Sequence, residues 1–272
     1  AEKIIRKKIL PVVQTNRMRL LLNMPVISKK VKQKIREQVL DVFGGKAYEM
    51  VVGGAPLNQS IETFLKSIDF PLTIAYGTTE TAPLIAFSDY TEYELFSCGK
   101  IVNHMEMKIN STDPDNMMVK GLNLMLGYYK NEEATREVID EDGWFHTGDL
   151  ATVSSDGHIY IKGRIKNMLL GANGQNVYPE EIEDKLNSMT MVNESLIVQH
   201  GNQLVGLVHP DMEEAQMMGF NDDDLKNIME QNRQELNTLL PPFCKISEIR
   251  IHNEEFQKTP KKSIKRYLYK IS

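Results

Sequence analysis

The sequence predicts an α/β fold followed by a smaller α+β domain, and three patterns support this prediction. An apolar run at 46–52 ends in a glycine turn and leads into an amphipathic helix, which is the pattern of a βα unit. A second apolar run at 72–75 ends in polar residues. Toward the C-terminus, two apolar runs flank a turn, and a long capped helix precedes a last apolar run at 246–251.

The composition is that of an ordinary soluble globular protein. The 272 residues suffice for two domains, and the 41% hydrophobic and 25% charged fractions are average values. A net charge of −5 gives no sign of a nucleic-acid binder. Cys98 and Cys244 lack metal-ligand spacing, which predicts reduced thiols. No apolar run approaches the ~18 residues of a membrane span, and no signal peptide is recognisable, so we expect a cytoplasmic protein.

The first part of the chain is rich in Lys and Arg. Val31, Ile35 and Val39 recur at helical spacing, so we expect an amphipathic helix that begins with Ser28 as its cap and ends at Phe43. The basic residues would form its solvated face, and peripheral contact with an anionic membrane surface or with polyphosphate is the alternative. The chain starts on helical material without a cap, which is expected of a segment cut from a larger protein.

The glycine turn after the first strand consists of Gly53, Gly54 and Ala55, and Asn58 is expected to cap the next helix. Ligands bind at the carboxyl ends of strands in parallel sheets, and glycines let the backbone approach a flat ring closely. A tight turn without a ligand explains the same residues equally well. The polar segment after the second strand comprises Tyr76, Gly77, Thr78, Thr79 and Glu80.

Residues 84–141 are expected to form strands and turns. The predicted strands are 102–109 and 117–120, and the segment 121–129 is interpreted as a structural turn before a helix near Glu132, without a chemical role.

A carboxylate and a guanidinium flank the next predicted hairpin. Asp149 follows a Thr-Gly bend and precedes an apolar run, Arg164 ends the following strand, and an Asp-Gly turn at 156–157 joins the two strands. A carboxylate can accept two hydrogen bonds from a vicinal diol such as ribose, and the fork of an arginine suits a ribose or phosphate oxygen. Taken alone, the pair would more simply be solvated.

The amino-acid sequence of this stretch closely resembles that of the adenylate-forming superfamily, which includes acyl-CoA synthetases, adenylation domains of peptide synthetases and luciferases. The resemblance is carried by Gly-Trp-Phe-His-Thr-Gly-Asp-Leu at 143–150 and by Asp-Gly-His-Ile-Tyr-Ile-Lys-Gly-Arg-Ile-Lys at 156–166. Gly-Gly-Ala-Pro-Leu at 53–57 and Thr-Pro-Lys-Lys-Ser-Ile-Lys-Arg at 259–266 look most like bacterial long-chain fatty acid–CoA ligases. The resemblance spans nearly the whole chain but only the C-terminal half of a family member.

The resemblance implies a nucleotide site. Asp149 and Arg164 would bind the ribose of ATP or AMP, Thr79 the α-phosphate, and Glu80 a Mg²⁺ ion, which prefers carboxylate oxygens beside phosphate. Other nucleotide-binding positions would be Gly53, Gly54, Ala55, Tyr76, Gly77 and Thr78.

The family also has a C-terminal lysine that reaches the substrate carboxylate and the α-phosphate. Lys262, followed by Lys265, matches that lysine best, and Lys261, which stands where the family prefers glycine, is the weaker candidate.

The resemblance further implies a mobile C-terminal domain. The large AMP-binding domain would contribute 1–165, and a small α+β lid would comprise 166–272, with Lys166 as the hinge. Rotation at the hinge would exchange Lys262 for a glycine loop on the CoA side, marked by Gly171 and Gly174.

The expected reaction joins a fatty acid or another carboxylate to CoA through an acyl-adenylate, with release of AMP and pyrophosphate. The family's Ser/Thr-Gly phosphate loop has no match in residues 1–52, so we expect weak nucleotide binding and little or no turnover without the N-terminal half of the same protein. Two alternatives stay open: an adenylation domain that loads a carrier protein, and a non-catalytic nucleotide-binding fragment. No carrier domain follows Ser272, which favours CoA.

Overall fold

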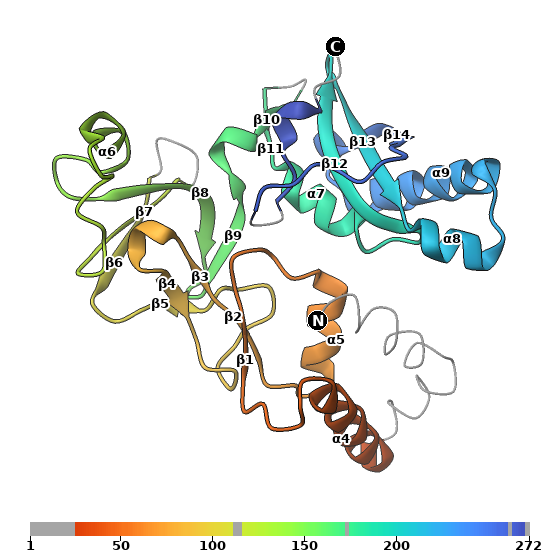
Figure 1. Cartoon of the computed structure of the whole chain (residues 1–272), viewed down its shortest axis with the longest axis horizontal. Coiled ribbons are helices and arrows are strands. Elements are labelled where there is room, and N and C mark those ends of the chain that lie inside the picture. Colours follow the sequence, from red (N-terminus) through yellow and green to blue (C-terminus); the bar gives the residue numbers. More distant parts are fainter. Residues whose placement is uncertain (1–24, 111–115, 172–173, 261–262, 270–272) are drawn as a thin grey trace. The chain divides into compact units, whose positions relative to one another are not determined.

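The computed structural model describes residues 25–110, 116–171, 174–260 and 263–269 (Figure 1). The chain divides into two compact units. The first contains 1–147 with 151–161, and the second contains 148–150 with 162–272. In the described residues, no helix has both the length and the apolar character needed to cross a membrane.

The first unit contains the predicted βα unit. Strand β1 (Met50–Val52) leads through a turn into helix α5 (Gln59–Ser67), and strand β2 (Leu72–Ile74) then pairs in parallel with β1. Helix α4 (Pro25–Val42) contributes Ile35 and Val39 to the same hydrophobic core. The helix begins at Pro25, so the prediction of Ser28 as its cap was wrong.

Strand β1 is shorter and more exposed than predicted. The expected buried strand at 46–52 is reduced to three residues, of which Val51 is 53% exposed. Side chains alternate along a strand, and Met50 and Val52 pack against the core while Val51 faces the other way. Among the described residues β1 pairs only with β2, and Val51 is its one exposed side chain.

The N-cap of α5 was predicted correctly. Asn58 accepts hydrogen bonds from the backbone N–H groups of Ser60, at 3.1 Å, and Ile61, at 3.4 Å, so two of the N–H groups that every helix start leaves unpaired are satisfied.

Glu62, on the buried face of α5, is an unexpected charge in this core. Its Oε1 accepts hydrogen bonds from the Tyr93 hydroxyl and from the Phe96 backbone N–H, at 2.5 Å for the latter. Burial raises the pKa of the Glu62 carboxyl above its usual value, and the two hydrogen bonds oppose that rise.

Replacing Glu62 by glutamine is expected to remove a pH dependence of stability. A carboxyl whose pKa is raised in the folded state binds protons more tightly there, so stability is highest in acid and falls as the pH rises above 4.5. The Glu62→Gln chain keeps an acceptor oxygen but cannot ionise. The free energy of unfolding is measured in urea at pH 5 and pH 8 for both chains. The value for the variant minus that for the native chain should increase with pH by up to about 1.4 kcal/mol per pH unit. A difference independent of pH would contradict the assignment.

Two further sheets complete the β-rich part of the chain. One has the order β3-β4-β5 and the other β6-β7-β8-β9, and a shared core of aliphatic side chains and Phe145 packs against them. The helix predicted near Glu132 is present, capped by Asn131. The elements are β3 (Tyr76–Gly77), β4 (Leu84–Phe87), β5 (Lys100–Ile101), β6 (Met105–Asn110), β7 (Asn116–Gly121), α6 (Glu132–Val138), β8 (Phe145–Val153) and β9 (Ile159–Arg164).

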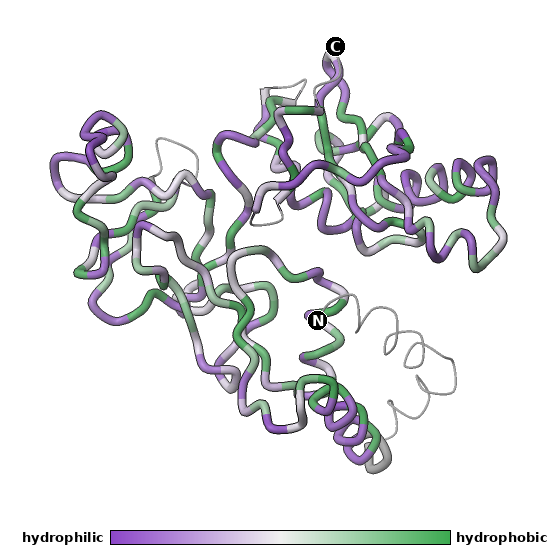
Figure 2. The backbone as a smooth tube through the Cα atoms, viewed as in Figure 1, coloured by the Kyte–Doolittle hydropathy of each residue, from purple (hydrophilic) through white to green (hydrophobic). Residues whose placement is uncertain are grey.

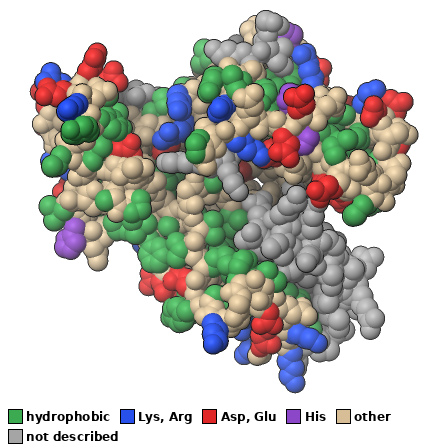
Figure 3. All heavy atoms as spheres, viewed as in Figure 1, with side chains coloured by type: hydrophobic (Ala, Val, Ile, Leu, Met, Phe, Trp, Pro, Cys, Tyr) green, Lys and Arg blue, Asp and Glu red, His purple; other side chains and the backbone are tan. Residues whose placement is uncertain are grey.

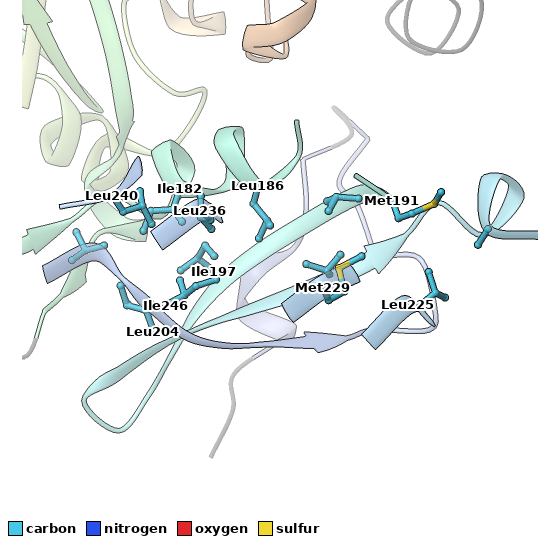
Figure 4. Packing of buried hydrophobic residues seen from close by; sticks show 14 residues of the cluster. Ile182, Leu186, Met191, Ile197, Leu204, Leu225, Met229, Leu236, Leu240 and Ile246 are labelled. Carbon is cyan, nitrogen blue, oxygen red and sulfur yellow. The ribbon is translucent and has the colours of Figure 1, made fainter. Parts of the chain in front are cut away.

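The second unit has a three-stranded sheet of order β12-β13-β14, in which β12 and β13 are antiparallel and β13 and β14 are parallel. Helices α7 and α9 pack against it around a core that includes Ile182, Leu186 and Leu236 (Figure 4). The elements are η3 (Ile165–Asn167), β10 (Leu169–Leu170), β11 (Asn176–Val177), α7 (Pro179–Leu186), β12 (Val192–His200), β13 (Gln203–Pro210), α8 (Met212–Met218), α9 (Asp222–Leu239), η4 (Pro242–Cys244), β14 (Ile246–Ile251) and η5 (Arg266–Leu268).

Helix α9 shows why this unit was predictable. Its apolar residues recur on one side among polar ones, visible in Figure 2 as hydrophobic turns within a mostly hydrophilic helix. Asn221 caps it in a capping box with Asp224, and the aspartates of its first turn complement the helix dipole. The sequence analysis missed α8, a seven-residue helix too short to show periodicity.

Candidate active site

The predicted carboxylate–guanidinium pair is present on the β8–β9 hairpin. Arg164 donates to Asp149 twice, from Nε to Oδ1 at 2.5 Å and from Nη2 to Oδ2 at 3.3 Å. The hairpin turn is closed by a hydrogen bond from the Gly157 N–H to the Ser154 carbonyl, and Gly157 has a φ of +95°. One prediction was wrong in detail: Arg164 ends β9 as expected, but Asp149 lies within β8 rather than at the end of a strand.

The two members of the pair differ in exposure. Asp149 is 6% exposed, whereas the Arg164 side chain is 43% exposed. The guanidinium therefore fixes the orientation of a buried carboxylate while it remains accessible to solvent. A carboxylate offers about four acceptor positions, so Asp149 can accept hydroxyl groups of a diol in addition to the arginine.

The first unit brings the two glycine-containing segments together. Because β1 and β2 are parallel, Gly53, Gly54 and Ala55 leave the sheet at the same edge as Tyr76, and the Ala75 N–H donates to the Val52 carbonyl at 2.8 Å. All three residues of the first turn are exposed. This is the edge at which ligands bind in parallel sheets.

Thr79 and Glu80 lie in the short helix η2 (Thr79–Thr81), directly after β3. Thr78 and Thr81 close its first turn through a hydrogen bond from the Thr78 N–H to Thr81 Oγ1 at 3.3 Å.

Gly77 is required by the backbone alone. A Cβ at this position would lie 1.7 Å from the carbonyl oxygen of Pro83, the residue directly before the paired strand β4. No side chain fits there, whatever ligand binds nearby.

The segment 121–129, predicted to have no chemical role, supports η2 directly. The Tyr128 hydroxyl donates to Glu80 Oε1 at 2.9 Å, and the Met125 N–H donates to the Glu80 carbonyl at 2.7 Å. Asn123 Nδ2 donates to the carbonyls of Thr81, at 2.6 Å, and Leu84, at 3.0 Å. Sequence reasoning missed Asn123 and Tyr128 because the partners are about forty or more positions apart and no local pattern links them.

Lys166 lies in the short helix η3, and its neighbours contact the start of α7. Asn167 Nδ2 donates to Glu180 Oε1 at 2.6 Å, and Lys162 Nζ lies 3.1 Å from Glu181 Oε1. Lys166 itself is exposed.

The predicted glycine loop connects β10 and β11, which pair as a short antiparallel hairpin. The Gly171 N–H donates to the Gln175 carbonyl at 2.8 Å, and the Gly174 N–H donates to the Gly171 carbonyl at 2.9 Å. Ala172 and Asn173 lie outside the described residues.

The candidate lysines Lys261 and Lys262 also lie outside the described residues. The residues on either side of them are paired, since Lys258 and Ile264 form an antiparallel bridge and the Thr259 N–H donates to the Ser263 carbonyl at 2.8 Å.

Arg266 anchors the segment that follows these lysines. Its guanidinium lies 2.8 Å from each oxygen of the buried Glu183 of α7, and Nη2 also donates to the Ile197 carbonyl at 3.1 Å. The Ile197 N–H in turn donates to Glu183 Oε1 at 2.6 Å. The anchor was not predicted, because the sequence contains no signal that joins positions 183 and 266.

Charged side chains of both signs are interspersed among the described residues on the face shown in Figure 3. This view shows no extended patch of one sign over the described residues, which accords with the modest net charge of −5.

Comparison with known proteins matches two family models to the chain. The model described as AMP-binding enzyme matches residues 6–129, and the model described as AMP-binding enzyme C-terminal domain matches residues 166–270.

Curated relatives are long-chain-fatty-acid–CoA ligases. ACSBG2 of Rattus norvegicus is 37% identical over 157 residues, covering 57% of this chain and 23% of the relative. FadD15 of Mycobacterium bovis is 32% identical over 181 residues, covering 66% of this chain and 29% of the relative. The chain thus spans about a quarter of the length of these relatives.

Two solved structures show the same fold. O-succinylbenzoate CoA synthetase (MenE) from Bacillus subtilis, in complex with AMP, has a TM-score of 0.66 at 21% identity, covering 88% of this chain and 50% of the other. The adenylation domain of a carboxylate reductase from Mycobacterium chelonae has a TM-score of 0.70 at 21% identity, covering 89% and 39%.

Proposed function

The chain belongs to the AMP-binding, adenylate-forming enzyme family, and from this membership we propose that it forms part of an ATP-dependent fatty acid–CoA ligase. In the proposed reaction, a fatty-acid carboxylate attacks the α-phosphorus of ATP and releases pyrophosphate. The CoA thiol then displaces AMP from the acyl-adenylate to give the thioester. The observation that carries the proposal is the Asp149–Arg164 pair, set in the stretch 143–166 whose sequence resembles the family.

The proposed roles follow from the chemistry of the side chains. Asp149 accepts the ribose hydroxyls, and Arg164 orients Asp149 and donates to a ribose or phosphate oxygen. Thr79 donates its hydroxyl to the α-phosphate. Glu80 follows Thr79 in η2, and its carboxylate is an oxygen ligand of the kind that suits Mg²⁺. The ion would supply charge neutralisation at the phosphates when bound.

A domain step is part of the proposal. It rests on three predictions: a domain boundary between 165 and 166, a hinge at Lys166, and the exchange of Lys262 for the loop of Gly171 and Gly174. We further propose a cytoplasmic location, with peripheral membrane contact through the basic residues of α4.

Titration with nucleotides tests the proposal. The chain should bind a non-hydrolysable acyl-adenylate analogue more tightly than AMP, because a ligase-derived site contacts both the acyl and the nucleotide portions. Equal affinities would favour the alternative of a simple nucleotide-binding fragment. If the whole protein transfers the acyl group to a carrier protein but not to CoA, the carrier-loading alternative is favoured.

The isolated chain is expected to show little or no ATP–pyrophosphate exchange, because residues 1–52 contain no match to the family's phosphate loop. Exchange at ordinary enzyme rates by this chain alone would refute that expectation, although it would leave the ligase proposal intact.

Replacing Tyr128 by phenylalanine tests the support of Glu80. The change removes the hydrogen bond from the hydroxyl to Glu80 Oε1, which is worth about 1 kcal/mol, so Mg²⁺-dependent nucleotide affinity should fall about fivefold. Titration of AMP with and without Mg²⁺ measures this. Tyr129→Phe is the matched control, since the neighbouring Tyr129 is 88% exposed and its ring faces Lys130. An equal loss in both variants would contradict the role of Tyr128.

A further inference from the structure

A histidine and two carboxylates converge beside the turn that joins β8 and β9. Nδ1 of His158 lies 2.7 Å from Asp156 Oδ2 and 3.2 Å from Glu94 Oε2. These three residues, here called the His158 cluster, come from two segments far apart in sequence, and their ligand atoms all lie within 4.8 Å of one another. None of them has a role in the proposed ligase reaction.

The imidazole is the fixed member of the His158 cluster. The His158 side chain is 6% exposed, and its Nε2 lies 3.2 Å from the backbone carbonyl oxygen of Glu92. A carbonyl can only accept, so Nε2 carries a hydrogen, and Nδ1 is the ring nitrogen that faces the two carboxylates. Metal-binding histidines are commonly held in this way, with the second ring nitrogen donating to a carbonyl.

The backbone around the His158 cluster is also held in place. The Ser154 hydroxyl donates to Asp156 Oδ1 at 2.6 Å and receives the His158 backbone N–H at 3.0 Å, which fixes the turn. The segment of Glu94 is joined to β9 by a hydrogen bond from the Cys98 N–H to the Ile159 carbonyl at 2.7 Å. The two segments that supply the ligand atoms therefore keep their relative position without any ion.

A single proton on Nδ1 leaves part of the charge uncompensated. Both carboxylates approach the same nitrogen, so one proton must serve two negative groups, whereas a divalent cation would neutralise both. Around Zn²⁺, ligand atoms at ~2.1 Å from the metal lie roughly 3.4 Å apart. The distance from Nδ1 to Asp156 Oδ2 is 2.7 Å and would have to lengthen by about 0.7 Å. The Asp156 and Glu94 side chains are 56% and 51% exposed, which leaves them free to make this adjustment.

We propose that Glu94, Asp156 and His158 bind a divalent transition-metal ion, with Zn²⁺ preferred for its mixed nitrogen and oxygen ligands. Nδ1 of His158 and one oxygen from each carboxylate coordinate the ion, and water completes the coordination shell. The ion ties the segment before β5 to the β8–β9 turn, so its role is structural.

Zinc titration of the full 272-residue chain, stripped of metal by a chelator, tests this proposal. A chromophoric competitor should report one site whose Zn²⁺ affinity falls at least tenfold in Glu94→Gln and in Asp156→Asn, because each change removes one charged ligand. Both positions are exposed, so these variants are expected to fold. Co²⁺ should give visible absorption bands with native chain that both variants weaken.

Glu92→Gln is the matched control, since Glu92 is an exposed carboxylate on the same segment whose side chain is not part of the His158 cluster. His200→Ala controls for adventitious binding by another histidine. Both should bind Zn²⁺ as the native chain does. The proposal is wrong if Glu94→Gln and Asp156→Asn keep native affinity, or if the controls lose as much. Because the readout is metal binding without nucleotide, the result is independent of the ligase proposal.

Discussion

Replacing Asp149 by asparagine is expected to reduce the affinity of the chain for AMP and for an acyl-adenylate analogue about 100-fold. Two hydrogen bonds from ribose hydroxyls to a carboxylate contribute about 1.5–3 kcal/mol each, and an amide retains one acceptor oxygen without the charge. A loss of about 3 kcal/mol corresponds to roughly two orders of magnitude in the dissociation constant. Calorimetric or fluorescence titration of native and variant chains measures the change.

The same substitution should leave the chain folded. The partner, Arg164, is 43% exposed, so water can solvate its guanidinium once the carboxylate is lost. Arg164→Ala should cost more stability, because Asp149 is 6% exposed and would lose the guanidinium while remaining charged.

Asp142→Asn is the control, since this aspartate is an exposed turn residue. If Asp149→Asn binds AMP as tightly as Asp142→Asn does, the assignment of Asp149 to the ribose is wrong, and with it the main support for the proposed function.

Replacing Arg266 by alanine is expected to destabilise the second unit by about 3–5 kcal/mol. The change leaves Glu183 buried without its guanidinium, and an uncompensated buried charge is among the most costly single defects. Burial raises the pKa of the Glu183 carboxyl, and Arg266 opposes that rise. The variant should therefore lose further stability as the pH rises above 4.5, where Glu183 must ionise without a partner.

Arg250→Ala supplies the matched control. Arg250 pairs with Glu248 at the surface, with side chains 41% and 47% exposed, and such pairs contribute about 0–1 kcal/mol. A double variant, Glu183→Gln with Arg266→Met, should recover most of the stability lost in Arg266→Ala, because it removes the buried charge and keeps an acceptor for the Ile197 N–H. Urea unfolding followed by circular dichroism compares the three chains. Equal losses of unfolding free energy in Arg266→Ala and Arg250→Ala would disprove the stabilising role of the Glu183–Arg266 pair.

Local signals explain the parts of the fold that the sequence predicted. Asn58 was identified as a cap because a short polar side chain before a periodic apolar pattern satisfies unpaired N–H groups within three residues. The strand order β12-β13 followed from two apolar runs across a tight turn.

The remainder depends on contacts between distant positions. Three features join segments that lie close together only in the complete fold. They are the hydrogen bond from Tyr128 to Glu80, the ion pair between Glu183 and Arg266, and the His158 cluster. The overestimated length of β1 has a related cause, since an apolar run does not reveal which of its side chains will find a packing partner.

The close approach at Gly77 has a practical consequence for mutational mapping. An alanine scan of the segment around Glu80 would register position 77 as essential for nucleotide affinity, yet the cause would be the collision with the opposite strand. Thermal denaturation of the same variants recognises such a false positive. Substitution of a residue that contacts only the ligand leaves the melting temperature unchanged, whereas Gly77→Ala lowers it.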